Sequence, residues 1–348
     1  MFFKKRILGI DIGTDAIKIV EISALGKHMK LENYAQVHSS SLSKESLLNI
    51  DEKGNLASSQ LISSAIRDIL KESKIKTKKV VFSIPDFLTF STYFEIPPMP
   101  EKEIAGAVYY NASKYLTLPS SEVTLDWKII PSEQKDNNSI KIFLIAVSNQ
   151  VIKEYRQIAR SIGLELYAME PEVFGIKRSL IGSVKDTICF LDMGAKTSTI
   201  NIVDNGYLKR SYSFNIGGNQ LSDDLMSTLK ISLSEAEKIK IDEGLMSKKE
   251  EAVRVIKNSV DQIFLEIKNI SSEFLEKEKK QIKEFYITGG LSSMPGLKSY
   301  FADKFKSSVY MPNYFLELYH PKILDDLLNE MSPRFSAVVG VALGILEV

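Results

Sequence analysis

The chain opens with two alternating apolar runs, residues 7–12 and 17–22, separated by the short polar stretch 13–16. This pattern predicts two strands joined as a hairpin, and a third run at residues 31–39 would extend the sheet. Residues 57–73 carry apolar side chains at helical spacing, which predicts an amphipathic helix packed on that sheet. Residues 78–85 then predict a strand closed by Pro85.

The pattern changes after Asp86. A β-branched and aromatic run, residues 87–100, ends in prolines and is followed by a predicted helix over residues 101–116. Residues 122–131 and 139–148 flank a polar loop and predict a hairpin, and residues 149–164 predict a second helix with Gly163 at its C-terminus. We interpret this segment as a compact α+β block inserted into the first half of the chain.

The opening pattern recurs at residue 187. The sequence "CFLDMGAKTSTINIV" repeats the features of "LGIDIGTDAIKIVEI": a buried strand ending in Asp-x-Gly, a small polar turn and an amphipathic strand. The tripeptide "DNG" after the second copy is a strong hairpin signal. A charged helical region at 219–283, a strand at 284–290, a helix at 294–305 and a terminal helix at 333–348 complete the prediction.

Composition excludes several classes of function. The formal net charge of the 348 residues is +1, which provides no global field for nucleic acid or anionic lipid. The single Cys189 allows no intrachain disulfide and fits a reducing compartment, and the three histidines lack metal-ligand spacing. No run approaches the roughly 20 apolar residues of a membrane span, and the N-terminus lacks the features of a signal peptide. We therefore expect a cytoplasmic protein.

Asp11 stands inside the first apolar run, and Asp192 takes the same place in the second copy. A buried carboxylate costs several kcal/mol unless it is paired. Each aspartate could simply cap its own turn. Alternatively, the two glycine-rich turns face each other across a cleft, where their backbone N–H groups suit phosphate oxygens and the two aspartates hold Mg²⁺. The repetition favours the second interpretation.

A third glycine-rich junction, "YITGGLSSMPGL", would let a phosphate or flat ring approach the backbone. The order of these motifs resembles the actin-like ATPase superfamily from Leu8 to the C-terminus. That resemblance implies an α/β fold with two duplicated mixed-sheet halves around a nucleotide cleft, and here a small α+β subdomain inserted in the first half. The implied cofactors are ATP and Mg²⁺.

The resemblance also implies roles for individual residues. In the segment "AMEPEVFG", Glu170 would position the attacking water, and in "EAEKIKIDEG", Glu237 and Lys240 would bind ribose and base. A solvated helix with opposite charges at helical spacing is the alternative interpretation of that second segment. Asp11 and Asp192 would orient the metal. The remaining nucleotide contacts would be Gly13, Thr14, Asp15, Lys18, Gly194, Ala195, Lys196, Gly217, Gly218, Gly289, Gly290 and Ser293.

Domain boundaries follow from the same resemblance. Residues 1–80, with 166–185 and 333–348, would form the core of the first half, and residues 81–165 the inserted peptide-binding subdomain. Residues 186–230 and 283–332 would form the second half. Residues 231–282 would form a helical subdomain that clamps the nucleotide.

The inserted block resembles the subdomain of the PilM family of type IV pilus assembly. The matching features are Glu95-Ile96-Pro97 before a helix, and Glu122-Val123 with Asp126-Trp127 on a strand; Asn111 departs from the acid often found there. The resemblance implies a cytoplasmic scaffold that holds the N-terminal cytoplasmic peptide of PilN, an inner-membrane protein, in a groove of this subdomain. Hydrolysis of ATP would be slow or absent.

The same resemblance implies contacts with other pilus machinery and leaves self-association open. It implies no nucleic acid, and a membrane only through partners. The aromatic candidates for the groove are Phe87, Phe90, Tyr93, Tyr109 and Tyr110, for most of which we expect core packing instead.

Two rival functions remain. The first is an FtsA-like filament protein of division, although the chain stops at Val348 without the C-terminal membrane helix of that class. The second is a small-molecule kinase of the sugar-kinase kind, which needs an acidic general base beside its substrate. No loop between the phosphate motifs offers an obvious one.

Overall fold

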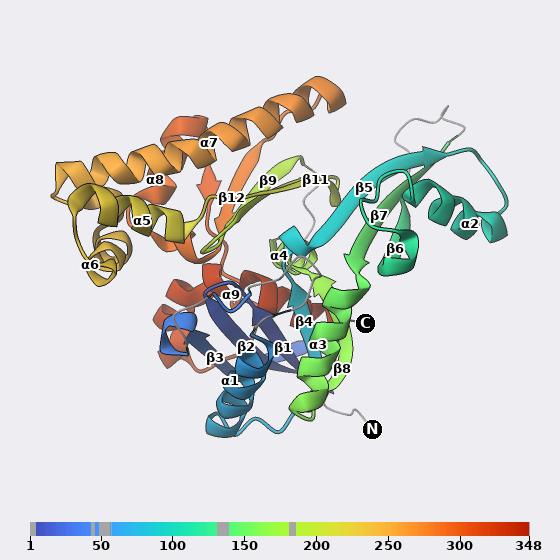
Figure 1. Ribbon diagram of the computed structural model, residues 1–348, viewed down its shortest axis with the longest axis horizontal. Helices are drawn as coiled ribbons and strands as arrows, with labels where there is room; N and C mark the ends of the chain where they lie inside the picture. Colours follow the sequence, from blue (N-terminus) through green and yellow to red (C-terminus); the bar gives the residue numbers. More distant parts are fainter. Residues whose placement is uncertain are drawn as a thin grey trace.

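The computed structural model describes residues 5–42, 46–48, 56, 58–130, 139–180 and 186–347. Two α/β halves lie one above the other, and a smaller α+β unit projects to one side (Figure 1). The predicted hairpin loop at 132–138 lies outside the described residues. Among the described helices, none combines the length and the apolar character that crossing a membrane requires.

The first half is built on a five-stranded sheet of order β3-β2-β1-β4-β8. Its strands are β1 (Lys5–Ile12), β2 (Ala16–Leu25), β3 (His28–His38), β4 (Lys79–Ile84) and β8 (Glu165–Pro171). The predicted hairpin is confirmed, because β1 pairs antiparallel with β2, while it runs parallel to β4. The parallel strands β1, β4 and β8 therefore end at the same edge of the sheet.

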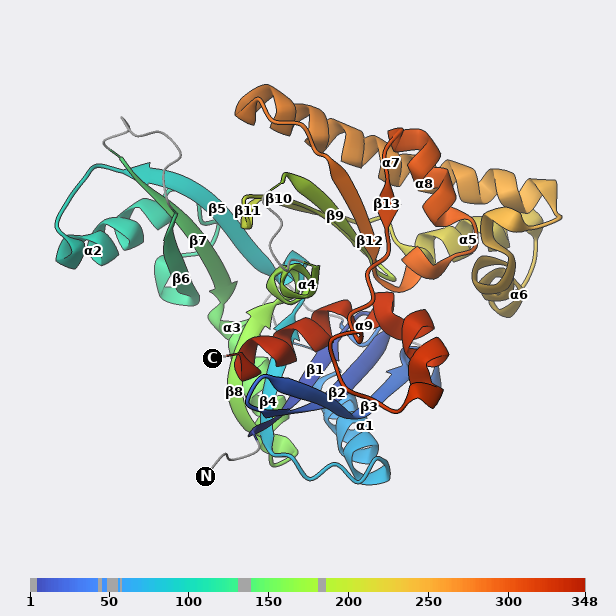
Figure 2. The same cartoon turned by 180° about the vertical axis from the view of Figure 1, so that it is seen from behind.

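Helices cover both faces of this sheet. The helices α1 (Ser59–Glu72) and α3 (Asn149–Ser161) share one hydrophobic core with it. The long helix α9 (Asp325–Leu346) packs on the opposite face, next to α4 (Glu172–Leu180) (Figure 2).

The second half repeats this arrangement, with a sheet of order β11-β10-β9-β12-β13. Its strands are β9 (Ile188–Met193), β10 (Ser198–Asp204), β11 (Tyr207–Phe214), β12 (Glu284–Thr288) and β13 (Val309–Tyr310). The β10–β11 turn contains Asn205 and Gly206 at φ 49° and 76°, the left-handed conformations that the "DNG" signal predicts. The sequence repeat is therefore a structural duplication.

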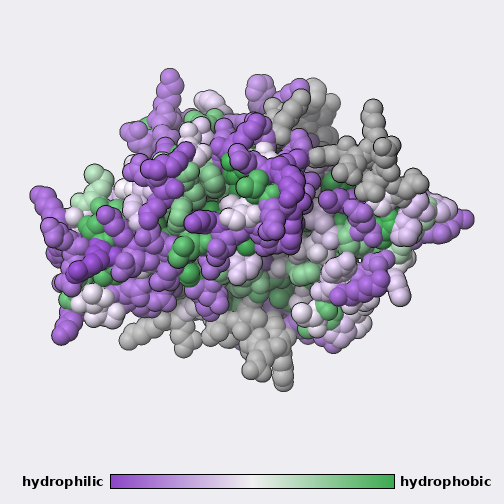
Figure 3. Space-filling view, turned by 90° about the horizontal axis from the view of Figure 1, so that it is seen from above, coloured by the Kyte–Doolittle hydropathy of each residue, from purple (hydrophilic) through white to green (hydrophobic). Residues whose placement is uncertain are grey.

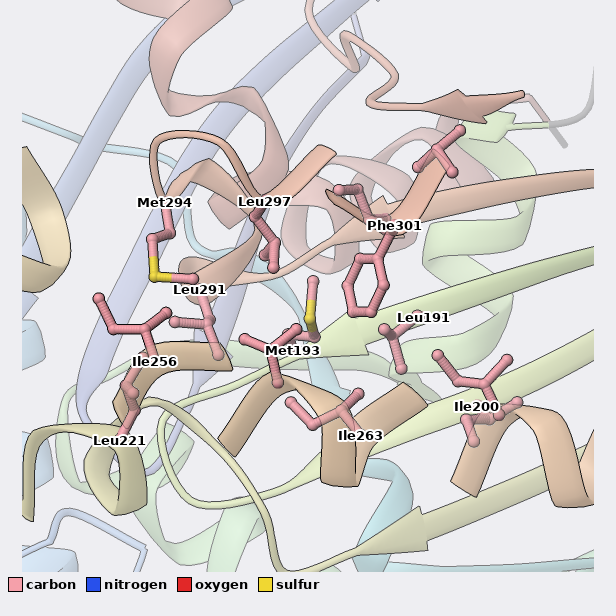
Figure 4. Packing of buried hydrophobic residues seen from close by; sticks show 14 of the residues in the cluster. Leu191, Met193, Ile200, Leu221, Ile256, Ile263, Leu291, Met294, Leu297 and Phe301 are labelled. Atoms are coloured by element: carbon pink, nitrogen blue, oxygen red, sulfur yellow. The ribbon is translucent and has the colours of Figure 1, made fainter. Parts of the chain in front are cut away.

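The helices α5 (Gly218–Leu229), α6 (Leu233–Lys238), α7 (Glu250–Glu278) and α8 (Leu297–Phe305) share one core with the second sheet. Figure 4 shows Met193 and Leu191 from the sheet meeting Ile263, Leu291 and Phe301 from the helical side. A π-helical turn, η4 (Ile239–Glu243), and two 3-10 turns, η5 (Gly244–Met246) and η6 (Gly290–Ser293), complete this half. The residues predicted as a separate helical subdomain are thus continuous with the second half.

The inserted unit is an antiparallel sheet of order β5-β7-β6, with helix α2 (Glu101–Ala112) packed on it. Its strands are β5 (Thr89–Ile96), β6 (Val123–Ile130) and β7 (Ile140–Ser148), and it has a hydrophobic core of its own. The unit is smaller than the predicted range 81–165. The helix α3 lies outside it, because its apolar side, including Tyr155 and Ile158, packs into the first half.

Two further boundaries differ from the prediction. Residues 314–318 belong with the first half rather than the second, because Tyr314, Phe315 and Leu318 are buried in its core. The terminal helix begins at Asp325, ahead of the predicted start at residue 333, and runs through Pro333. The carbonyl of Pro333 accepts hydrogen bonds from Gly289 N and Thr288 Oγ1, so this helix also meets the end of β12.

Candidate functional site

Asp11 lies at the end of β1 and is only 2% exposed. It accepts hydrogen bonds from Lys18 Nζ at 2.9 Å and from Ser83 Oγ at 2.6 Å. Burial alone would lower the pKa of Lys18 on β2, but the carboxylate of Asp11, which lies opposite on β1, raises that pKa above its ordinary value. The acid inside the apolar run is therefore one member of a buried ion pair.

Asp192 takes the equivalent place on β9. Burial raises its pKa to about 6, while Lys18 acts to lower it and Asp11 to raise it. Gly289 approaches this carboxylate so closely that a Cβ there would come into collision with Asp192 Oδ1. Since Gly289 also has φ +85°, only glycine fits between β12 and η6.

A cleft of about 130 Å³ lies between the halves and is lined by both Asp-x-Gly turns. The turns are closed alike: Gly13 N donates to Ala16 O and Gly194 N donates to Thr197 O, each at 2.9 Å. The predicted residues that line this cleft are Asp11, Gly13, Thr14, Asp15, Lys18, Asp192, Gly194, Ala195, Gly289 and Gly290.

A second group of predicted residues lies next to the cleft. Lys240 Nζ contacts Glu237 Oε1 at 2.6 Å, Ser222 Oγ at 2.7 Å and Gly218 O at 3.1 Å. Gly218 N in turn donates to Gly194 O at 3.0 Å, and a Cβ on Gly217 would lie 2.6 Å from Ala195 O. This group is thus held against the second turn.

Three further predicted residues belong neither to the cleft lining nor to the group beside it. Lys196 is exposed, and the Ser293 hydroxyl is buried without a hydrogen-bond partner among the described residues. Glu170 forms a two-point ion pair with Arg178, at 2.7 and 3.0 Å. Because its oxygens are committed to this arginine and do not line the cleft, the water-positioning role expected for Glu170 does not fit its place.

Glu172, two residues later, lines the cleft instead. Burial raises its pKa well above the ordinary value, and the charges of Asp11, Asp192 and Asp86 add to the effect. Asp86 N donates to Glu172 Oε2 at 3.2 Å, and Asp86 Oδ1 accepts from Val173 N at 3.0 Å. The signal that could have identified Glu172 is its position after Pro171, where β8 ends and α4 begins.

Other residues of the cleft gave no signal in the sequence. His38 Nδ1 lies 3.0 Å from Asp15 Oδ2, and Ser39 Oγ donates to Asp15 Oδ1 at 2.7 Å. Burial acts to raise the pKa of Asp15, but these two partners and the charge of Lys240 lower it overall. His38 and Arg334 both line the cleft, and each comes from a strand or helix remote in sequence from the turns.

Most of the aromatic side chains considered as candidates for the groove are exposed. The expectation of core packing is wrong for four of the five candidates, because Phe87, Phe90, Tyr109 and Tyr110 are each exposed. Tyr93 packs on Phe143 with ring centroids 4.8 Å apart. It also lines a cavity of about 260 Å³ between β5 and β11, so the inserted unit borders the second half.

The carboxylates of the cleft suit a metal ion that is coordinated partly by the protein and partly by a bound ligand. No group of three or more His, Cys, Asp or Glu residues that could enclose an ion occurs in the described part of the chain. Asp11 and Asp192 are nevertheless close enough for the charge of one to raise the pKa of the other. Two carboxylates next to glycine-rich turns fit Mg²⁺, which keeps several waters and is usually bound through one or two carboxylates plus phosphate.

The duplicated halves and the paired turns across one cleft define an actin-like ATPase fold. Solved structures agree: MreB5 of Spiroplasma citri bound to AMPPNP matches at TM-score 0.52 and 15% identity, covering 99% of this chain and 96% of that one. EutJ of Carboxydothermus hydrogenoformans matches at TM-score 0.60 and 16% identity, covering 97% and 89%.

Residues 9–345 match the family model described as type IV pilus assembly protein PilM, and the chain belongs to this family. A PilM–PilN type IV pilus biogenesis complex matches at TM-score 0.83 and 21% identity, covering 97% of this chain and 98% of that one. The cell division protein FtsA of Enterococcus faecalis is 21% identical over 88% of this chain and 79% of its own length. The resemblance to pilus and actin-like proteins in the sequence is therefore confirmed.

Proposed function

We propose that this protein is a nucleotide-dependent scaffold of type IV pilus assembly in the cytoplasm. It binds ATP with Mg²⁺ between its halves and holds the N-terminal cytoplasmic peptide of an inner-membrane PilN protein on the inserted unit. The observation that carries the proposal is the pair of equivalent Asp-x-Gly turns lining one cleft. Membership of the PilM family supports the pilus assignment.

The backbone of the two turns would bind the phosphates, with Lys18 beneath them. The cleft volume of about 130 Å³ is below the roughly 300–1,000 Å³ of typical ligand pockets, so it suits the phosphate end of a nucleotide. Glu237 and Lys240 lie next to the second turn and would contact the ribose and base. Their mutual hydrogen bond at 2.6 Å fixes both side chains in advance.

Asp11 and Asp192 would hold Mg²⁺, which supplies charge neutralisation for the phosphate oxygens. Glu172 then takes the place in the mechanism first expected for Glu170. Its carboxylate lines the cleft at the N-terminus of α4, where it can orient a water molecule and accept a proton from it. The Asp86 N–H holds this carboxylate in position.

Nucleotide binding is tested by calorimetry with Mg-ATP on the full chain and on the Asp192→Asn variant. We expect at least a tenfold loss of affinity in the variant, because it removes one of two charges that would hold the metal opposite the phosphates. A matched control is Asp126→Asn on the exposed strand β6, which should bind as the parent does. Equal affinity in all three proteins would contradict the cleft model.

The rate of ATP hydrolysis distinguishes the proposed roles of Glu172 and Glu170. Glu172→Gln should lower any ATP hydrolysis by about 10²-fold, the usual size of a general-base contribution, while leaving ATP affinity nearly unchanged. Glu170→Gln should keep the parental rate, since that side chain pairs with Arg178 outside the cleft. Phosphate release over several hours provides the measurement. A larger loss in Glu170→Gln than in Glu172→Gln would reverse our assignment.

A further inference from the structure

The end of the first sheet that lies farthest from the cleft carries an unusual concentration of positive charge. The strands β1, β4 and β8 run parallel, with the cleft at their C-terminal ends, so their first residues lie together at the opposite end. The helix α1 also finishes there. We define the basic face as residues 67–79, from the end of α1 to the start of β4, together with residues 156–167, from the end of α3 into β8.

These two segments form one continuous surface. Arg67 Nη2 donates to Ser161 O at 3.1 Å, which joins α1 to α3. Glu165 N donates to Lys78 O at 2.8 Å, and in the strand register of β4 and β8 the backbone of Lys79 lies opposite that of Glu165. The charged ends of the two helices and two strands therefore face the solvent side by side, at the bottom of Figure 1.

The charge of this face contrasts with that of the whole chain. Its two segments contain eight lysines or arginines and three acids, an excess of five, whereas the whole chain has a net charge of only +1. All eight cations are exposed, and none of them forms an ion pair with any described residue. They are Arg67, Lys71, Lys74, Lys76, Lys78, Lys79, Arg156 and Arg160. Within the described part of the chain, this positive charge is therefore not neutralised.

An apolar component accompanies the charge. Tyr167 is 57% exposed on the edge strand β8, with Lys79 Nζ 5.6 Å from its ring centroid. Aromatic side chains beside lysines are typical of proteins that rest on a lipid surface.

We propose that the basic face docks on an anionic membrane surface. A spread of lysines over an exposed end without a pocket suits a field of lipid phosphates, which attracts each cation without requiring a fixed geometry. The described cavities lie elsewhere, in the cleft and between β5 and β11. This inference does not depend on the proposed nucleotide or peptide sites, and it adds a direct membrane contact to the indirect one expected through a partner.

Vesicle flotation with the full chain tests the proposal. One set of vesicles is phosphatidylcholine with about one-third phosphatidylglycerol, and the other is phosphatidylcholine alone. We expect binding to the anionic vesicles only, weakening as salt shortens the screening length. The variant Lys71→Glu/Lys76→Glu/Lys78→Glu should bind at least tenfold more weakly. Absence of binding to anionic vesicles at physiological salt would overturn the proposal.

The matched control is Lys248→Glu/Lys268→Glu/Lys298→Glu, which makes the same change in net charge on exposed lysines of the second half. That half includes the α7 side of the molecule, where Figure 3 shows a mainly hydrophilic surface. The control should bind vesicles like the parent. An equal loss of vesicle binding in both variants would mean that net charge alone determines binding. That result would contradict binding through the basic face.

Two further probes identify the class of ligand. Binding of a short single-stranded RNA should be weaker than binding to anionic vesicles, and Tyr167→Ser should weaken vesicle binding at high salt. Tighter binding of RNA, lost in the same lysine variant, would assign the face to nucleic acid instead. Unchanged circular dichroism and thermal midpoint in each variant exclude misfolding as the cause.

Discussion

At the level of single residues, the acids of the cleft differ in whether a neighbouring positive charge neutralises them. Asp11 has Lys18 and Ser83, and its charge is balanced in the folded protein. Asp192, Glu172 and Asp86 form no ion pair with any residue that the structure describes, and burial raises the pKa of all three. The cleft therefore holds one aspartate paired with a lysine and three acids that favour a bound cation or a proton.

Asp86 gives a pH-dependent prediction. Its pKa rises to about 7 from 3.8, so between these pH values the folded protein holds a proton that the unfolded chain has released. The free energy of unfolding should consequently fall as the pH rises from about 4 to about 7. Asp86→Asn keeps an acceptor for Val173 N and removes the titration. We expect it to be more stable than the parent at about pH 8, on the order of 2 kcal/mol, and similar at about pH 5.

Urea unfolding at the two pH values provides the measurement. The matched control is Asp126→Asn on the exposed strand β6, which should change stability by little at either pH. Lower stability of Asp86→Asn at both pH values would mean that the carboxylate contributes mainly through its hydrogen bonds.

At the level of the elements, periodicity and turn chemistry predicted most strands and helices because each carries its signal locally. The "DNG" turn is the clearest case, since Asn205 and Gly206 both adopt the conformations it requires. The errors concern packing between distant segments. The apolar side of α3 does not reveal which sheet it covers, and Pro333 is tolerated inside α9, where its carbonyl accepts from β12 and from Gly289.

The residues of the site also divide into those that local sequence predicts and those that depend on packing between distant segments. The two turns and the glycine junctions were predictable because glycine and aspartate at fixed spacing mark them in the sequence. Glu172 was missed because the choice between Glu170 and Glu172 depends on where β8 stops and α4 starts. His38 lies next to Asp15 because β2 pairs with β3, and no local sequence motif predicts that pairing.

The contact between α4 and α9 gives a prediction about packing. A Cβ on Gly340 would collide with the carbonyl group of Gly175, and a Cβ on Gly175 would lie 2.6 Å from Ala337 O, so the helices cross this closely because both residues are glycine. Gly340→Ala should destabilise the protein by about 3 kcal/mol or more, as overpacking against backbone does. Gly106→Ala in the exposed helix α2 is the control, because a Cβ added there would have no neighbour within 4 Å.

For the control Gly106→Ala we expect the free energy of unfolding to rise by about 0.5–1 kcal/mol, because alanine has a better helix propensity than glycine. Thermal and urea unfolding of the two variants provide the comparison. Similar stability of Gly340→Ala and Gly106→Ala would show that α4 and α9 can separate without cost, contrary to the close crossing described above.

At the level of the whole molecule, the three parts are joined by one hydrophobic cluster. Phe143 and Ile130 from the inserted unit, Val173 and Ile176 from α4, and Phe190 from the second sheet are buried together. The residues just before the inserted unit also reach the cleft, since Phe87 lines it and Asp86 N contacts Glu172. A change in the separation of the halves therefore has a physical path to the inserted unit.

This arrangement predicts coupling between the two proposed ligands. A synthetic peptide with the N-terminal residues of the PilN protein from the same genome, labelled with a fluorophore, should bind more tightly when Mg-ATP is present. A coupling of about 5- to 150-fold is typical of allosteric proteins, and the peptide must then strengthen ATP binding by the same factor. Fluorescence polarisation measures the effect of Mg-ATP on peptide affinity, and calorimetry measures the effect of the peptide on ATP affinity.

At an Mg-ATP concentration that fills the parent but not the variant, Asp192→Asn should bind the peptide like the nucleotide-free parent, because its cleft stays empty while its inserted unit is intact. Tyr110→Ser, on the exposed side of α2, keeps the cleft unchanged and should retain its affinity for ATP. If the peptide binds with one affinity in the presence and absence of saturating Mg-ATP, the shared cluster holds the inserted unit rigidly, and the protein is a scaffold whose partner contact is independent of nucleotide.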